Sequence, residues 1–529
     1  MGNPGKVELH PDVIVIGSGI GGLSCGALLA RYGLSVVVCE SHSIAGGAAH
    51  AFQRQGFTFE SGPSLYSGIS YSPSPNPLRQ VLDAIEEDLP CFNYDTWGCH
   101  LPEGDFDTQV GAEQFCDVLQ TLRGSQAVQE WQNLQTLMEP YGKAATALPP
   151  AAMRWDLGAA LTFMPFLGRL GWQLPHVFRL TGTFQQLIAG TIKDPFIQNW
   201  LDLLCFLLSG LPANGTSAAE MAFMFADWYR PNVTLDFPVG GSEAMVNVLV
   251  RGLEKYGGKL LLNHHVEQIL LERDRAVGIR LRGGQVIKAR QAVVSNASIW
   301  DTLPLLPSES NSHQSMFPSS RQRWQQERQQ LQPCPSFMHL HLGIDGQGIP
   351  TDLACHHIIV QDWQRGVTAS QNVVVCSIPS LLDASLAPAG KHAIHAYTPA
   401  TEPYELWQGL KRGSNAYQEQ KATRAEALWQ ALERVIPDIR DRCEVTLVGT
   451  PLTHAHYLRR YQGSYGPAIA ADQALFPGAN TPIKGLLCCG DSTFPGIGLP
   501  AVAASGMITA NTIAPVHQHL NLLKKLALT

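Results

Sequence analysis

The sequence has little charge, and it lacks the patterns typical of several protein classes. Charged residues make up 15% of its 529 positions, the formal net charge is −7, and we find no basic stripe or zinc-finger spacing. These absences argue against nucleic acid as a partner. The 12 cysteines are scattered without a C-x-x-C pair. We therefore predict buried thiols in a reducing compartment rather than a disulfide framework.

Long apolar runs are also missing. The N-terminal stretch MGNPGKVELHPD has neither the apolar core of a secretory signal nor the Arg- and Ser-rich character of a transit peptide. The stretches 203–219 and 492–523 carry little charge, but Pro, Asn and other polar residues interrupt both. Neither reaches the roughly 20 continuous apolar residues that a transmembrane helix needs. We therefore predict a cytoplasmic chain without a membrane span.

Glycine, in contrast, is abundant, and it clusters near the N-terminus. The run VIVIGSGIGGLSCGALLARYGLSVVVCE places a short β-branched strand before Gly17, Gly19 and Gly22, and a helix-compatible segment after them. In this G-x-G-x-x-G spacing the glycines allow a tight turn, a close approach of backbone to a pyrophosphate, and close packing of helix on strand. A glycine-rich turn by itself can also be a plain structural loop.

The residue that ends the second strand decides between these interpretations. Glu40 stands where a carboxylate can accept the ribose hydroxyls of an adenosine. This context predicts dinucleotide binding, and it disfavours NADP because the carboxylate would repel a 2′-phosphate.

The nucleotide signals resume far along the chain. Residues 256–297 read as successive short strands and turns, and LLCCGD at 486–491 precedes a small-residue helical segment. We predict an α/β fold, with a discontinuous Rossmann-like FAD-binding domain and an inserted α+β substrate domain. The predicted ranges are 11–100, 234–300 and 445–515 for the first domain, 101–233 and 301–444 for the second, and 516–529 for a C-terminal tail.

Further glycines favour FAD over nicotinamide. Gly46 and Gly47 follow the acidic strand end, where backbone could approach an extended dinucleotide a second time. Asp491 directly follows a strand and can bond ribityl hydroxyls, and the helix after Pro500 can direct its positive end at a flavin ring. The alternative is that these are only turn glycines, which the backbone entropy of so many glycines disfavours.

These motifs, with GFTFESGPS, AVVSNAS, GTPLTHAHYLRRYQGSYGP and CGDSTFPGIGLPAVAASG, resemble the flavoprotein family of carotenoid isomerases and bacterial-type phytoene desaturases, above all its prolycopene isomerase-like branch. The resemblance implies FAD as the cofactor. It also implies a set of cofactor-binding residues, namely Gly17, Ser18, Gly19, Gly22, Glu40, Gly46, Gly47, Val266, Gly490 and Asp491. Desaturases usually carry Arg where this chain has Ala48, whereas Leu499 and Pro500 look more desaturase-like than isomerase-like.

The implied substrate is an apolar polyene dissolved in a membrane, which needs a long apolar channel. Residues 153–206 suit a membrane-facing role, because apolar and aromatic residues alternate there with cations. The apolar members are Trp155, Leu161, Phe163, Met164, Phe166, Leu167, Trp172, Phe178, Phe184 and Phe196, and the cations are Arg154, Arg169, Arg179 and Lys193. An ordinary helical lid over a core is an equal alternative. We predict peripheral attachment to a membrane, with a plastid or thylakoid surface as one setting.

Three functions remain open at this point. The first is an FAD-dependent carotenoid cis–trans isomerase, or a desaturase that passes electrons to a quinone or another acceptor. The second is a soluble flavin oxidase of the amine-oxidase type, since fold does not fix function. The third is a non-enzymatic lipid binder, against which the intact glycine set and Glu40 argue.

Histidines offer no clear catalytic assignment. His339 and His341 alternate along an expected strand, and Cys355, His356 and His357 stand together, but no recognised ligand spacing accompanies them. We predict that they are structural and that no metal is bound. His454 and His456 could reach flavin or substrate, or could simply pack there. We assign no catalytic acid or base.

Overall fold

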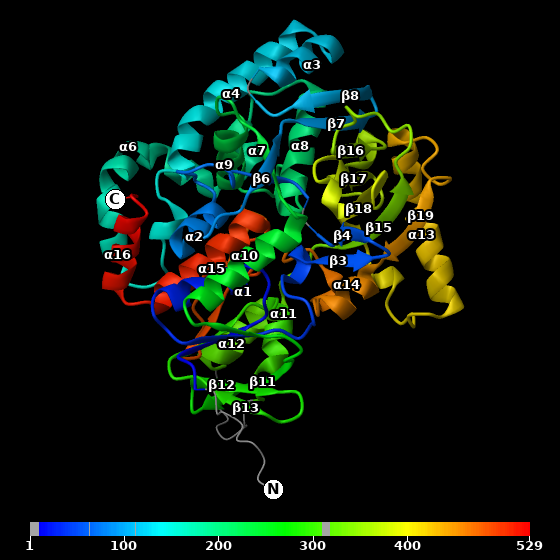
Figure 1. Ribbon diagram of the computed structural model, residues 1–529. Coiled ribbons are helices and arrows are strands. Elements are labelled where there is room, and N and C mark those ends of the chain that lie inside the picture. Colours follow the sequence, from blue (N-terminus) through cyan, green and yellow to red (C-terminus); the bar gives the residue numbers. More distant parts are fainter. Residues whose placement is uncertain (1–9, 63, 112, 309–317, 529) are drawn as a thin grey trace.

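The computed structural model describes residues 10–62, 64–111, 113–308 and 318–528 (Figure 1). Residues 1–9, on which most of the prediction about a missing leader rests, lie outside the described residues, as does residue 529 of the predicted tail. The described part contains a five-stranded parallel sheet, a seven-stranded sheet, smaller sheets and a helical region.

The parallel sheet has the strand order β10-β2-β1-β14-β20. Its strands are β10 (Lys259–Leu261), β2 (Val36–Cys39), β1 (Val13–Ile16), β14 (Ala292–Ser295) and β20 (Leu486–Cys488). All four residues of β1 are buried, as expected for a central parallel strand that is uncharged and β-branched. Strands from distant stretches of the chain share this sheet, which confirms the predicted discontinuous Rossmann-like fold.

Different layers cover the two faces of this sheet. Helices α1 (Ile20–Arg31), α10 (Gly241–Lys255) and α15 (Leu499–Ile513) pack together over one face. An antiparallel sheet of β11 (Val266–Glu272), β12 (Arg275–Leu281) and β13 (Val286–Lys288) covers the other. The carboxyl ends of the parallel strands stay accessible between these layers, and ligands bind at this edge in open α/β sheets.

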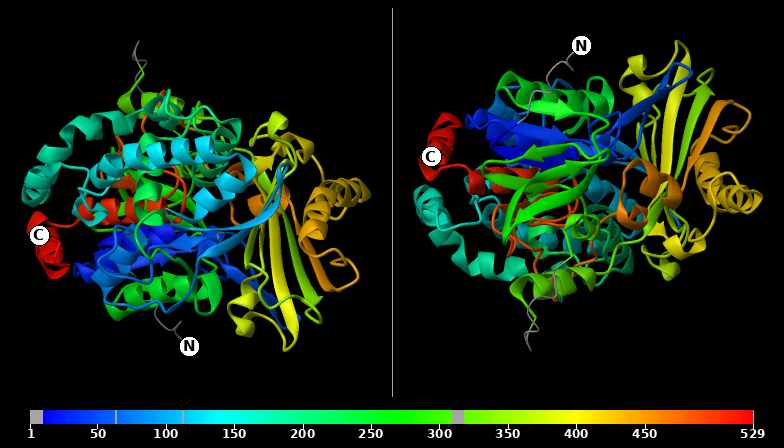
Figure 2. Two further views of the ribbon diagram at one scale, coloured as in Figure 1. Left: turned by 90° about the horizontal axis from the view of Figure 1, so that it is seen from above. Right: turned by 90° about the horizontal axis from the view of Figure 1, so that it is seen from below.

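The seven-stranded sheet has the order β19-β15-β18-β17-β16-β7-β8. Its strands are β19 (Cys443–Gly449), β15 (Ser336–Asp345), β18 (Lys391–Glu402), β17 (Val373–Ser377), β16 (His356–Val360), β7 (Thr96–Leu101) and β8 (Gly104–Gln109). Along β15, Leu340 and Leu342 pack in one core with α13 (Asn415–Val435). His339 and His341 point to the opposite face, because successive strand residues alternate. Figure 2 shows α13 on the outer side of this sheet.

Helices form the remaining large part. A buried core that includes Trp131 and Trp200 holds together α3 (Gln114–Leu122), α4 (Ser125–Ala145), α8 (Pro195–Ser209) and α9 (Ala218–Trp228). In contrast, every residue of α6 (Leu167–Val177) is at least partly exposed. The other helices are α2 (Pro77–Ile85), α5 (Ala159–Phe163), α7 (Phe184–Ile188), α11 (Ile299–Thr302), α12 (Ser320–Gln329), α14 (Pro451–Tyr457) and α16 (Val516–Lys525).

Two small sheets complete the fold. The hairpin of β3 (Ala51–Arg54) and β4 (Phe57–Glu60) contacts β18, and β5 (Tyr66–Ser67), β9 (Leu235–Pro238) and β6 (Cys91–Tyr94) form the second. The predicted domain boundaries stay a prediction. The strands that cross residues 100 and 445, β7 and β19, both pair within the seven-stranded sheet, and the predicted C-terminal tail contains helix α16 with buried Leu522 and Leu523.

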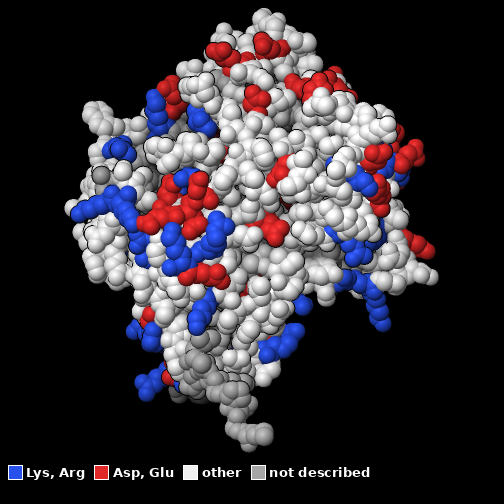
Figure 3. All heavy atoms as spheres, in the orientation of Figure 1, with Lys and Arg blue, Asp and Glu red and all other residues white. Residues whose placement is uncertain are grey.

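The surface charges and the cysteines agree with what the composition indicates. On the face drawn in Figure 3, small clusters of Lys and Arg lie beside clusters of Asp and Glu, separated by wide uncharged areas. All twelve cysteines belong to the described residues, and none of them forms a disulfide there. None of the helices in the described part of the chain combines the length and apolar character needed to cross a membrane.

Candidate functional site

Three neighbouring cavities lie where the sheets and the helical region meet. The first, about 440 Å³, is lined by Glu40 and is called the Glu40 cavity. The second, about 240 Å³, is lined by Asp491 and is called the Asp491 cavity. Both share Gly19, Ala48, Asn296 and Arg460 in their walls. The third, about 130 Å³, is the Glu220 cavity, and Ile497 lines both it and the Asp491 cavity.

The glycine turn is packed too closely for any side chain at its third glycine. A Cβ added to Gly22 would lie 2.2 Å from the carbonyl oxygen of Gly17. This contact holds the start of α1 against the end of β1. The helix begins after Gly19 without a side-chain cap, so its first N–H groups and the positive end of its dipole can bind an anion.

Glu40 is held in place by its neighbours at the end of β2. Its Oε2 accepts hydrogen bonds from the Ser18 backbone N–H at 2.9 Å and the Ser18 hydroxyl at 2.7 Å, and its Oε1 accepts one from the His42 N–H at 2.8 Å. Oε1 also accepts a longer bond from the Ser41 hydroxyl, at 3.2 Å. A ribose hydroxyl can take that place when the Ser41 hydroxyl rotates away. Glu40 can therefore still bind ribose hydroxyls in the Glu40 cavity.

A second glycine pair approaches the first. Gly46 donates its N–H to the Ser18 carbonyl at 3.0 Å and forms an isolated parallel bridge with Gly19. Its φ of 109° lies in the left-handed region that favours glycine. Gly46 lines the Asp491 cavity and Gly47 the Glu40 cavity. The chain from β2 thus runs along both cavities, as an extended dinucleotide would require.

Arg460 and Asn296 are two site residues that the sequence interpretation missed. Arg460 forms an ion pair with Asp491 at 2.5 Å and donates to the carbonyls of Ser464 and Tyr465 at 2.8 and 2.9 Å. Asn296 follows β14, and its side chain lies against the glycine turn. Their signals were the arginine pair in HYLRRY and the asparagine in AVVSNAS, which directly follows a short apolar strand.

The predicted cofactor-binding residues lie close together, but they do not all line the same cavity. Four of them line the Glu40 cavity together with Gly47, namely Gly17, Gly19, Glu40 and Val266. The Asp491 cavity takes Gly46, Gly490 and Asp491, and Gly19 lines it as well. Ser18 and Gly22 line neither cavity, because Ser18 is buried under Glu40 and Gly22 packs on Gly17. The two therefore support the wall from behind.

The two cavities fit an FAD molecule. The Glu40 cavity offers a carboxylate and the backbone near Val266 for an adenosine, and the uncapped start of α1 lies where both cavities meet. Arg460 adds a cation at the same place, which suits a pyrophosphate. Asp491 and the first residues of α15 line the other end and can bond a ribityl chain and a flavin ring.

Behind the Asp491 cavity lies a column of buried histidines. His339 and His395 share a hydrogen bond of 2.8 Å, and His454 stacks on His339 at 4.6 Å between ring centroids. Burial lowers the pKa of His454 to about 3 and that of His341 to about 4, so these imidazoles are neutral at pH 7. His339 and His454 line the cavity, whereas His456 does not belong to its wall.

The same column brings together three potential metal ligands. Ligand atoms of His339, His341 and His395 lie within 4.8 Å of one another, so a third histidine does stand beside the predicted pair. The rings of His341 and His395 are stacked, 5° from parallel and 4.5 Å apart. Their lone pairs therefore lie in parallel planes and do not converge on one point, as tetrahedral coordination would need. The absence of a metal stays a prediction.

A mainly apolar cavity lies next to the cofactor cavities, but none of the predicted channel residues lines it. Apart from Glu220, the Glu220 cavity is lined mainly by apolar and small residues, including Leu475, which is 65% exposed. Its Phe494 contacts Trp155, with ring centroids 5.4 Å apart. Trp155 begins an exposed apolar segment, residues 155–178, whose outermost side chains are Leu157, Trp172 and Phe178, with 97, 86 and 74% exposed.

The predicted membrane-facing stretch was therefore too wide. Phe166, Phe184 and Phe196 are each at most 1% exposed and belong to buried cores. Arg154 is also buried and pairs with Asp156. An apolar helix that packs inside the protein and one that lies on its surface have similar composition, so the sequence did not separate them.

Comparison with known proteins agrees with this geometry. The chain is 32% identical to prolycopene isomerase 2, chloroplastic, of an Oncidium hybrid cultivar, over 96% of this chain and 85% of the relative. It is 24% identical to a neurosporene-forming phytoene desaturase of Cereibacter sphaeroides, over 95% of this chain and 94% of the relative. Among solved structures, an oxidoreductase from Methanosarcina mazei has a TM-score of 0.60 at 19% identity, covering 94% of this chain and 98% of that one.

These matches confirm the resemblance predicted from the motifs. The family of flavin-containing amine oxidoreductases matches residues 20–514, which include Gly22, Glu40, Asp491 and nearly all of the chain. The chain therefore belongs to this family, and the predicted FAD cofactor is confirmed as a property of the family's flavin-containing fold.

Proposed function

We propose that the protein is an FAD-dependent enzyme that isomerises a cis double bond of a carotenoid dissolved in a membrane. The observation that carries the proposal is the 32% identity to a prolycopene isomerase across 96% of the chain. The geometry supports it, since an apolar cavity adjoins the Asp491 cavity at Ile497. Bound FAD supplies the electron chemistry, and the chain's own residues hold it and orient the polyene.

Carotenoid desaturation is the second candidate. It is favoured by the likeness to a phytoene desaturase and by Leu499 and Pro500 at the start of α15, beside the Asp491 cavity. This reaction would need an electron acceptor such as a quinone. A soluble amine-type oxidase has only family-level support, because the likeness to solved structures at under 25% identity concerns the fold.

Chromatography of the pigments distinguishes these functions. Purified holoprotein, with its flavin reduced under anaerobic conditions, is incubated with vesicles that contain prolycopene. Isomerisation converts it to the all-trans isomer of the same mass. Desaturation with oxidised flavin and a quinone would instead give products with more conjugated double bonds from a more saturated precursor. An unchanged pigment profile under both conditions would refute both proposals.

We further propose that residues 155–178 attach the protein to the membrane surface. Leu157, Trp172 and Phe178 expose large apolar areas, and such side chains can insert below lipid headgroups while nearby Arg169 meets the phosphates. The contact of Trp155 with Phe494 connects this segment with the Glu220 cavity. A polyene could therefore leave the bilayer close to the opening beside Leu475.

Liposome flotation tests the attachment. The double variant Trp172→Ser and Phe178→Ser should bind anionic vesicles about 10²- to 10³-fold more weakly than the wild type, and float to a much smaller extent, because each replacement removes roughly 2 kcal/mol of apolar burial. Val286→Ser, which changes a residue that is 47% exposed on β13, is the matched control and should float normally. Equal flotation of all three proteins would contradict the proposal.

A further inference from the structure

The Glu220 cavity contains a chemical group that the cofactor does not use. Of the described residues in its wall, Glu220 alone carries an ionisable side chain, and its neighbours include Leu211, Ile469, Phe476 and Phe494. Glu220 stands in the first turn of α9. A carboxyl in an apolar wall costs free energy, about 1–3 kcal/mol when it lacks a partner. Such a group needs an explanation.

The carboxyl of Glu220 has no hydrogen-bond or ion-pair partner among the described residues, and burial alone raises its pKa to about 7. Two titratable side chains interact electrostatically with Glu220. They are Cys205 on α8 and Tyr465 in the loop after α14. Burial raises the pKa of Cys205 well above its ordinary value and that of Tyr465 above its ordinary range. Both are therefore neutral near pH 7, and Glu220 can keep its proton there.

The position of Glu220 matches the route of the proposed substrate. Ile497 lies in the wall of both the Glu220 cavity and the Asp491 cavity, and Leu475 marks the exposed side of the Glu220 cavity. Tyr465, which lines the Asp491 cavity, lies close enough for the Glu220 charge to act on it. A polyene that extends from the surface to the flavin end would pass this carboxyl.

We propose that Glu220 is the acid that exchanges a proton with the polyene during isomerisation, an inference that rests on the proposed function. The O–H bond of the carboxyl breaks while a C–H bond forms at one carbon of the conjugated chain. The cation that results is delocalised, so the neighbouring cis bond loses double-bond character and rotates. The hydrogen that this carbon carried before then leaves as a proton to the carboxylate, and the electron pair of its C–H bond restores the double bond. No oxidant or reductant is consumed.

The apolar wall serves this step in two ways. It limits the access of water, which would otherwise trap the cation or take up the proton. It also strengthens the attraction between the newly formed carboxylate and the positive polyene, since charges interact more strongly at low dielectric. Both effects require a single carboxyl without competing partners, as the lining of the Glu220 cavity provides.

Deuterium exchange in the holoenzyme tests this inference. The isomerisation of prolycopene in vesicles is run in D₂O with the wild type, Glu220→Gln and Glu60→Gln, and the products are analysed by chromatography and mass spectrometry. Glu60 is the matched control, because burial also raises its pKa to about 7 but it lines none of the three cavities. Flavin content and Tm are measured for each variant.

The inference predicts deuterium in the wild-type product and in the product of Glu60→Gln. Glu220→Gln should retain its flavin and fold but lose activity by about 10²-fold or more, as for the removal of a general acid. If the wild type isomerises without deuterium uptake, or Glu220→Gln isomerises at the normal rate, the inference is wrong while the proposed function stands. If the wild type isomerises no polyene, the proposed function fails and the inference fails with it.

Discussion

The Glu40 and Asp491 cavities share part of their walls, yet they are assembled in different ways. The Glu40 cavity takes many of its lining residues from one stretch, 16–50, at the ends of β1 and β2, and the others from 264–266, 296–305 and 455–460. The Asp491 cavity collects side chains from α8, β15, β18 and α14 and from the loops beside them. We call these two parts of the site the Glu40 half and the Asp491 half. The Glu40 half can be recognised in a short motif, whereas the Asp491 half depends on the whole fold.

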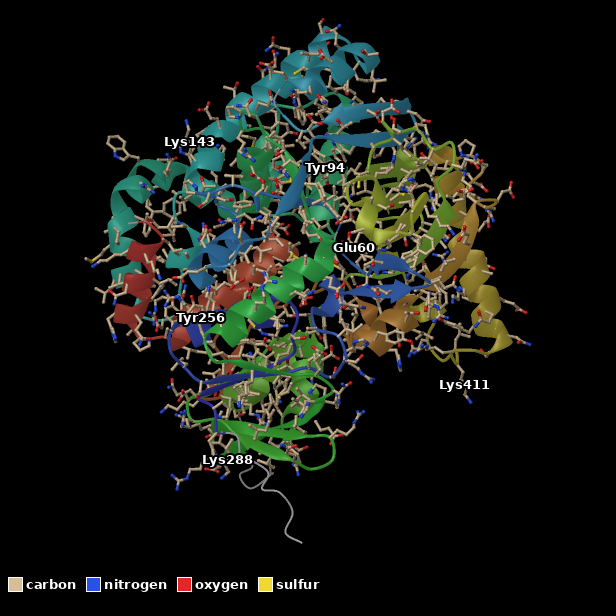
Figure 4. All side chains as sticks on the ribbon, in the orientation of Figure 1. Glu60, Tyr94, Lys143, Tyr256, Lys288 and Lys411 are labelled. Atoms are coloured by element: carbon tan, nitrogen blue, oxygen red, sulfur yellow. The ribbon has the colours of Figure 1, made fainter. Side chains whose placement is uncertain are left out.

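The two buried glutamates express the same difference. Glu40 lies at a strand end and accepts several hydrogen bonds from Ser18 and His42. Glu60, at the end of β4, accepts one from the Ser242 N–H at 2.7 Å, and its Oε2 has no partner among the described residues. Figure 4 shows Glu60 in the interior, beside the hairpin of β3 and β4. One carboxyl is arranged to bind a ligand, and the other to remain buried.

The largest effect should come from adding volume to the Glu40 half. In Gly22→Ala the new Cβ would lie 2.2 Å from the Gly17 carbonyl oxygen, so the turn must open and α1 must move. Overpacking of this kind costs about 1–3 kcal/mol or more. We expect the variant to lose its bound flavin, measured by absorbance after gel filtration, and to show a clearly lower Tm.

The control for this variant adds the same methyl group where space is free. Gly168 lies in α6, and a Cβ there would have no atom within 4 Å. Gly168→Ala should keep its flavin and gain slightly in stability, since alanine favours helix. A Gly22→Ala protein with normal flavin content would show that the turn is looser than its packing indicates, and the comparison of the two halves would lose its basis.

The elements that the sequence predicts correctly are those encoded in a short stretch of chain. Residues 256–297 were predicted as successive strands, and β10, β11, β12, β13 and β14 occur there. The strand along which His339 and His341 were expected to alternate is β15. These elements are encoded in local periodicity and turn residues, which a single sequence displays.

Other features depend on contacts between distant residues. His395 joins His339 and His341 only because β18 pairs with β15 in one register, and no local spacing reveals that pairing. The Glu220 cavity takes residues from two stretches more than 240 positions apart. Arg460 reaches Asp491 from the end of α14. Such sites are set by the tertiary fold, so the sequence alone did not indicate them.

An intermediate effect should come from Arg460, where the two halves meet. We expect Arg460→Gln to weaken FAD binding by about 10- to 100-fold, because a charge-assisted hydrogen bond contributes roughly 1.5–3 kcal/mol. The affinity of deflavinated protein is measured by quenching of FAD fluorescence. Riboflavin, which lacks the phosphates, should bind the variant and the wild type with similar affinity.

A matched arginine provides the control for that measurement. Arg282 pairs with exposed Glu267 on the covering sheet and is itself 62% exposed. Arg282→Gln should bind FAD normally. If Arg460→Gln reduced the affinity for riboflavin as strongly as that for FAD, the arginine would act through the shape of the site rather than through the phosphates.

The smallest effect should be a pH-dependent change in stability that sets Glu60 apart from an exposed carboxyl. Burial raises the pKa of Glu60 from 4.5 to about 7. Below pH 4.5 the group is protonated in both the folded and unfolded protein. Between pH 4.5 and 7 the unfolded chain releases the proton and the folded chain keeps it, so the free energy of unfolding falls as pH rises, by at most about 3 kcal/mol. Above pH 7 it falls no further.

Glu60→Gln should remove this dependence. The glutamine keeps a carbonyl oxygen for the Ser242 N–H, but its NH₂ adds a donor whose cost, about 1 kcal/mol, is the same at every pH. The informative quantity is therefore the Tm of the variant minus the Tm of the wild type, measured at several pH values. This difference should rise from pH 5 to pH 7 and then level off. Glu139, exposed beside Lys143, has a pKa lowered from 4.5 by that lysine, so Glu139→Gln should show no trend from pH 5 to pH 7. Parallel curves for Glu60→Gln and the wild type would mean that the Glu60 carboxyl is already ionised in the fold, and that the interior behind the Asp491 cavity is as well suited to charge as the Glu40 half.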